Sequence, residues 1–104
     1  MDISELKKVS DRSYDLAVAK QNALEKAHSR MLVAYEGHLL KADAETINLV
    51  KIISEDRQDF VILDINNNPV LVQDPGGLLD VLKSKNQEVL NSYYHTYQEF
   101  LKTR

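Results

Sequence analysis

The sequence contains no cysteine and no tryptophan, and only three glycines and two prolines among its 104 residues. The lack of cysteine excludes a disulfide scaffold, a thiol nucleophile and a thiolate metal site. No unbroken apolar run approaches the ~20 residues that a membrane-spanning helix needs, so we expect no membrane contact. The segment Met1–Lys8 lacks the apolar stretch of a secretory signal. These absences favour an intracellular protein, in a host cytoplasm, or a virion component.

The sequence also lacks an excess of positive charge, with 13 basic and 16 acidic side chains. The net charge is −3. Residues 1–41 carry seven basic and six acidic side chains, and residues 42–104 carry six basic and ten acidic ones. Neither part has the clustered positive field that neutralises phosphates. In a winged helix-turn-helix fold, residues 43–56 would form the helix that recognises DNA. That segment contains four acidic side chains and a single lysine, so its net negative charge opposes contact with phosphates. We therefore expect no direct contact with nucleic acid.

Helix-forming residues fill the first third of the chain. No glycine or proline occurs from Ser4 to Tyr35, and Ala, Leu, Lys, Glu and Gln are frequent. Apolar residues at helical spacing are Ala17, Leu24, Ala27, Met31, Ala34 and Tyr35. Gly37 is a natural stop after a helix. The pattern predicts a first helix over about 10–36, and the first nine residues either extend it or fray.

Two further helices are predicted. Asp43 suits an N-cap, because its carboxylate can accept from the free N–H groups of a first turn, and apolar residues follow to about residue 56. Pro75 suits the first turn of a last helix, which the pattern places at about 77–102. The predicted helices are therefore about 10–36, 43–56 and 77–102.

Between the second and third helices the period changes to that of strands. Residues 60–65 and 70–72 are β-branched, aliphatic or aromatic, and the segment Asn66–Pro69 separates them. Asparagine tolerates positive φ, and proline cannot donate to a strand ladder. The sequence predicts a β-hairpin over about 60–73. Both faces of its first strand are apolar, so something must cover both sides.

A long apolar stripe follows the last helix at heptad spacing. We assign partner binding to six of its residues: Leu82, Asn86, Val89, Tyr93, Tyr97 and Phe100. Tyrosine suits a protein interface because it buries a large area and keeps a polar tip. The alternative is that the stripe packs into the chain's own core. Asn86 either fixes register at a buried position or lies at the edge of the stripe in water.

Catalytic and metal-binding motifs are not found. Asp64-Ile65-Asn66-Asn67-Asn68 matches the opening of a calcium loop, but Pro69 and Pro75 stand where that loop needs glycine and glutamate. The three histidines His28, His38 and His95 show no metal-ligand spacing. No nucleophile elbow, phosphate loop or dinucleotide fingerprint occurs. We therefore predict no cofactor, no metal and no enzymatic activity.

The fold class that these elements predict is mainly α with a β-hairpin, an α+β single domain over residues 1–104. A helix of ~26 residues is about 39 Å long, whereas a compact domain of this length has a radius of gyration near 13 Å. The molecule is therefore expected to be elongated. Covering the apolar ends of such helices favours a protein partner or a homo-oligomer.

The stretch from Phe60 to Arg104, with its strand, its Asp-Ile-Asn-Asn-Asn-Pro segment, a second strand and a tyrosine-rich helix, resembles small accessory and structural proteins of tailed bacteriophages. The resemblance implies a role in virion assembly or in inhibiting a host, and it transfers no functional residue. Our leading hypothesis is a non-enzymatic interaction protein, namely an oligomeric helical adaptor or virion-assembly component. The alternative is a small regulator or inhibitor that binds a host enzyme or a nucleic-acid–protein complex.

Overall fold

The computed structural model describes the backbone of residues 3–102 and the side chains of residues 14–102. Its elements in order are α1 (Ile3–Arg30), β1 (Leu32–Tyr35), β2 (His38–Lys41), α2 (Ala44–Asp56), β3 (Phe60–Leu63), β4 (Pro69–Val72) and α3 (Pro75–Lys102). The two sheets are separate antiparallel hairpins, β1–β2 and β3–β4. The predicted class, mainly α with a β-hairpin, is confirmed.

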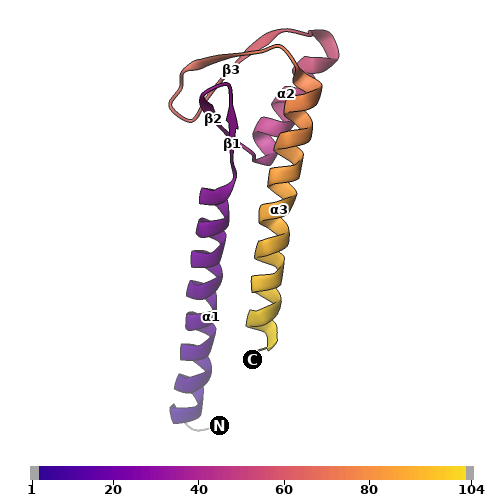
Figure 1. The fold of residues 1–104 in the computed structure, drawn as a ribbon. Coiled ribbons are helices and arrows are strands. Elements are labelled where there is room, and N and C mark those ends of the chain that lie inside the picture. The colour runs from indigo at the N-terminus through magenta and orange to yellow at the C-terminus, as the bar shows by residue number, and fades with distance from the viewer. Residues whose placement is uncertain (1–2, 103–104) are drawn as a thin grey trace.

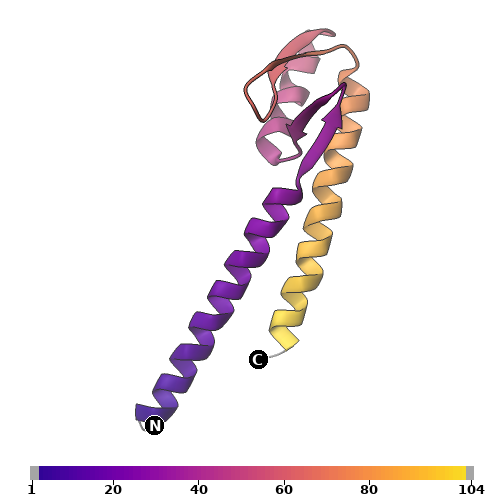
Figure 2. The ribbon, with the colours of Figure 1, turned by 60° about the vertical axis from the view of Figure 1, so that its left-hand side comes forward.

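Helices α1 and α3 lie side by side and antiparallel, and they form a stalk (Figures 1 and 2). The remaining elements, residues 32–72, form a head at one end, so both chain ends lie at the other (Figure 1). The radius of gyration is 19.3 Å and the extents are 65 × 23 × 23 Å, which confirms the predicted elongation. Lys20 of α1 lies 5.9 Å from the Tyr97 ring of α3.

Beyond the contact between Lys20 and Tyr97, helices α1 and α3 differ in length. Seventeen residues of α1 precede Lys20, whereas five residues of α3 follow Tyr97. At 1.5 Å per residue, α1 therefore reaches about 18 Å farther from the head. Figures 1 and 2 show the end of α1 projecting past the end of α3.

The predicted first helix ends too late. It was placed at about 10–36, with the first nine residues left either to extend it or to fray. Helix α1 does extend back to Ile3, but it ends at Arg30. The chain then forms the β1–β2 hairpin, which the sequence analysis missed. Glu36 and Gly37 both have positive φ, 48° and 83°. This is the backbone of a two-residue hairpin turn that matches strand twist, so Gly37 serves a hairpin rather than a helix end.

The other predicted boundaries agree with the structure to within two residues. Asp43 is the N-cap of α2, and its Oδ1 accepts from the Thr46 N–H at 2.9 Å. Pro75 is the first residue of α3. Asp74 precedes it and accepts from the Gly77 N–H at 3.1 Å. Each helix thus begins where a carboxylate satisfies a free N–H of the first turn.

The core lies where the head meets the stalk. Its largest fully buried side chains are Leu40, Leu82, Val50, Val72 and Val89. They come from a strand of each hairpin, from α2 and from α3, and α3 packs against α1, α2 and β1. The strands alternate buried and exposed residues with period two.

Candidate functional site

The stripe predicted to bind a partner lies largely within the chain's own core. Leu82 and Val89 are 0% exposed, so they leave no surface for another molecule. Tyr93 is partly buried and packs against the same core. For these three residues, the protein's own fold accounts for the apolar pattern. This corrects the assignment of Leu82 and Val89 to partner contact.

Asn86 is half-buried and forms a hydrogen bond within its own chain. Its Nδ2 donates to the Ala42 carbonyl oxygen at 3.0 Å. Ala42 is fully buried, and a buried carbonyl without a partner is costly. The asparagine therefore ties α3 to the segment between β2 and α2.

The last two stripe residues lie along the stalk. Tyr97 is half-buried, with Lys20 beside its ring, and Phe100 is also half-buried. For these two residues partner binding stays a prediction. His95, the histidine of the tyrosine-rich segment, is exposed and meets the Tyr94 ring edge-on at 6.1 Å between centroids.

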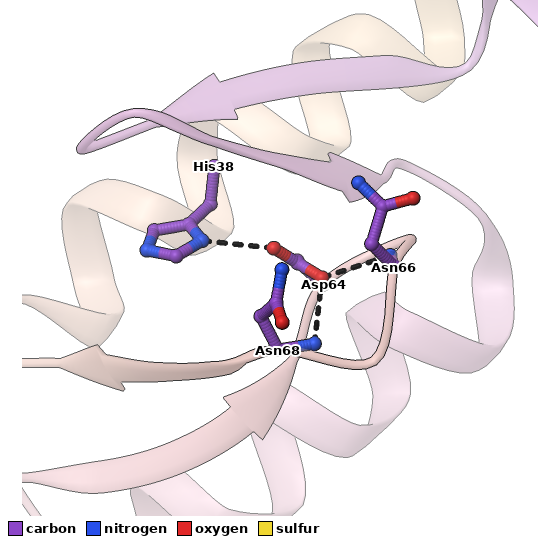
Figure 3. A network of polar contacts seen from close by, with 4 residues as sticks. All are labelled: His38, Asp64, Asn66 and Asn68. Atoms are coloured by element: carbon purple, nitrogen blue, oxygen red, sulfur yellow. Dashed lines mark hydrogen bonds and ion pairs between the residues drawn. The ribbon is translucent and has the colours of Figure 1, made fainter.

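A polar cluster joins the two hairpins. His38 Nδ1 lies 2.8 Å from Asp64 Oδ2, and the other carboxylate oxygen, Oδ1, accepts from the N–H groups of Asn66 and Asn68 at 2.8 and 2.9 Å (Figure 3). The Ile65 N–H donates to the Leu39 carbonyl at 3.0 Å. The carboxylate thus holds the turn of one hairpin and the first residue of β2 together.

The environment of this cluster keeps the carboxylate ionised. The Asp64 side chain is only 4% exposed. The His38 hydrogen bond and the N–H groups of Asn68 and Asn66 hold the pKa of Asp64 below its ordinary value of 3.8, although burial acts in the opposite direction. A histidine oriented by a carboxylate is half of a general-base arrangement, but no hydroxyl among the described side chains bonds to His38. We interpret the cluster as a clasp that fixes the head.

This clasp predicts a pH effect. Because the folded state holds a lowered pKa at Asp64, its contribution to stability is complete above the unfolded pKa and is lost as pH falls through the folded value. The gap in unfolding free energy between wild type and Asp64→Asn should therefore narrow below about pH 4. Urea unfolding at a series of pH values measures it, with Asp15→Asn on the stalk as the control for removing an exposed carboxylate. A gap that widens on acidification would contradict this interpretation.

The outer face of the β3–β4 hairpin is apolar and open. Phe60, Ile62, Val70 and Val72 point into the core. On the opposite face Val61 is 57% exposed, Leu63 60% and Leu71 48%. We call these three residues the outer hairpin face. Both faces of β3 are apolar in the sequence, although no site was predicted there. The rest of the chain covers only one of these two faces.

A hollow extends this face toward the end of α2. It has a volume of about 560 Å³, and its lining residues are Ile53, Arg57, Asp59, Phe60, Val61 and Leu71. Its charged members are one cation and one anion. An apolar centre with a polar rim is the usual anatomy of a protein–protein interface. The outer hairpin face and this hollow are therefore the surface best suited to another protein.

The described part of the chain shows neither a metal-binding cluster nor a membrane-spanning helix. Within residues that the structure describes, no group of three His, Asp or Glu side chains is placed to hold a metal ion. None of the described helices is both long and apolar enough to cross a membrane. No family model, no curated protein and no solved structure matches the chain. The resemblance to phage accessory proteins therefore stays a prediction from sequence.

Proposed function

We propose that the protein is a non-enzymatic assembly protein whose copies associate through the outer hairpin face. The observation that carries the proposal is the exposure of Val61, Leu63 and Leu71 on one side of a hairpin whose other side is already sealed in the core. Burying such a face removes apolar surface from water, which is the main driving force for association.

A second copy is the occupant that this surface favours. A two-fold interface uses the same patch twice, so the patch must complement itself. An apolar sheet face can pack on an identical face as in a β-sandwich. The rim contains both Arg57 and Asp59, so opposite charges are present on each copy. One hairpin face is small for a protein interface, and we therefore expect dissociation at roughly micromolar concentration.

Light scattering of purified protein tests this proposal. We expect the wild type to have the mass of a dimer or higher species at about 100 µM, well above the micromolar dissociation expected for so small an interface. Val61→Glu should be monomeric at the same concentration, because a carboxylate would be buried at the interface.

Val18→Glu on α1 is the matched control, since Val18 is also an exposed valine but lies on the stalk. It should keep the mass of the wild type. A monomeric wild type would contradict self-association. If Val18→Glu were monomeric and Val61→Glu remained oligomeric, the interface would lie on the stalk instead.

A further inference from the structure

The free edge of β1 exposes hydrogen-bonding groups of the backbone. The Ala42 N–H donates to the Met31 carbonyl at 2.9 Å, and the strands pair Leu32 with Lys41 and Ala34 with Leu39. Bonded and non-bonded pairs alternate along an antiparallel ladder. The Leu32 and Ala34 pairs are therefore the non-bonded ones. Their N–H and C=O groups point away from β2, and none of the hydrogen bonds among the described residues uses them.

A groove lies along that edge. It has a volume of about 470 Å³ and is lined by Leu32, Val33, Ala34, Asp80, Val81, Ser84, Lys85 and Glu88. Successive side chains of a strand point to opposite faces. Three consecutive residues of β1 can therefore all line the groove only if the groove runs along the backbone edge of the strand. The opposite wall is one side of α3. The groove thus offers strand hydrogen bonds on one side and side chains of a helix on the other.

Two other strand edges of the head are covered or blocked. The outer edge of β2 accepts the Ile65 N–H at the Leu39 carbonyl. On β4, the Asp64 N–H bonds to the Asn68 carbonyl at 2.9 Å, which places Pro69 in a non-bonded pair with Leu63. Pro69 therefore occupies a position whose backbone N–H would otherwise point away from β3. Proline has no N–H, and it commonly blocks the pairing of an edge strand with another strand. Strand β1 has neither protection.

The charges of the helix wall indicate the kind of segment that fits. Lys85 is 3.7 Å from Glu88 and is partly neutralised by it. Asp80 has no ion-pair partner among the described residues, and its side chain lies at the edge of the groove. The wall therefore presents one uncompensated negative charge beside Val81, which is half-exposed and apolar. A strand that carries an apolar and a basic residue two positions apart, and therefore on the same face, complements both.

We propose that the groove between β1 and α3 binds an extended segment of a partner protein by strand addition. The backbone of that segment bonds to Leu32 and Ala34, an apolar side chain contacts Val81, and a lysine or arginine pairs with Asp80. Main-chain bonds give such complexes affinity, and side-chain contacts give them specificity. This site differs from the outer hairpin face, so the two proposals can fail independently.

The probe is the acetylated and amidated hexapeptide Thr-Val-Thr-Lys-Thr-Val, which places valine and lysine on one face of an extended strand. This valine–lysine peptide is titrated into full-length protein and followed by NMR. Strand addition predicts that hydrogen exchange of the Leu32 and Ala34 amides slows at least tenfold at saturation. The Val33 and Tyr35 amides, already bonded to β2, should change little. The same peptide N-methylated at every residue should not bind, and a valine–glutamate peptide should bind at least tenfold more weakly.

Two variants separate the β1 edge from the rest of the hairpin. Ala34→Pro removes an outward N–H that the ladder does not use, and it should weaken the valine–lysine peptide at least tenfold. Lys41→Pro is the control, because Lys41 is the cross-strand partner of Leu32 and its N–H points to the opposite edge. It should bind as the wild type does.

Either of two results would overturn the proposal. One is no binding of the valine–lysine peptide at millimolar concentration. The other is binding that survives N-methylation or leaves the Leu32 and Ala34 amides unprotected. These peptide measurements use the wild-type protein, so they stand even where Ala34→Pro perturbs the hairpin.

Discussion

Replacing Leu82 by alanine is expected to lower the free energy of unfolding by about 3 kcal/mol, within the range measured for buried leucines. Leu82 has no exposed surface and belongs to the hydrophobic core of the chain. Alanine would remove three methyl or methylene-sized groups and leave a cavity in a close-packed interior. Chemical denaturation followed by circular dichroism measures the loss.

The matched control is Leu90→Ala, which makes the same change on the same helix at a residue that is 36% exposed. It should cost less than about 1 kcal/mol. The Leu82→Ala loss should also be the same at low and high protein concentration, because it arises within one chain. Equal losses at Leu82 and Leu90, or a Leu82 loss that vanishes on dilution, would contradict the intramolecular packing of the stripe.

Replacing Gly37 by alanine is expected to lower the free energy of unfolding by about 1–2 kcal/mol. Gly37 has a φ of +83°, and an added Cβ would meet nothing within 4 Å. The cost therefore comes from the backbone conformation alone, which L-residues with a Cβ adopt reluctantly. Thermal or urea unfolding measures the change.

Gly76→Ala is the control for Gly37→Ala. Gly76 lies in the first turn of α3, and its nearest neighbour to an added Cβ, Asp74 Oδ1, is at an ordinary 4.0 Å. Alanine is favoured over glycine in a helix, so this substitution should leave stability unchanged or raise it. A stabilising Gly37→Ala would mean that the β1–β2 turn does not form as described.

The sequence was sufficient where a local signal decides the structure. The cap at Asp43, the proline at the start of α3 and the change of period at Phe60 each depend on near neighbours in the chain. The helix boundaries and the second hairpin follow from them. Elongation also followed, because helix length is fixed by residue count.

The first hairpin was missed because Leu32–Tyr35 follows a helix without interruption and contains residues that suit either structure. Its real signal is the pair Glu36-Gly37 between Leu32–Tyr35 and His38–Lys41, two segments of equal length. A glycine by itself is equally consistent with the end of a helix and with a hairpin turn. The positive φ of the preceding Glu36 distinguishes the hairpin turn from the helix end. The clasp between His38 and Asp64 could not be predicted without that hairpin.

The site could not be located for a different reason. A heptad stripe has the same sequence pattern whether it packs on the same chain or on another. Leu82 and Val89 are buried within the chain because α3 packs against α1, α2 and β1, which the sequence pattern alone does not show. The apolar outer face of the second hairpin, in contrast, was visible in the sequence as a strand with two apolar sides.

The melting temperature as a function of protein concentration tests self-association through the outer hairpin face most directly. Only association makes apparent stability depend on concentration. Across about a hundredfold range around the micromolar dissociation expected of so small an interface, we predict that the wild-type melting temperature rises with concentration, while Val61→Glu shows a flat response and Val18→Glu follows the wild type. A flat wild-type response over that range would contradict the proposed assembly.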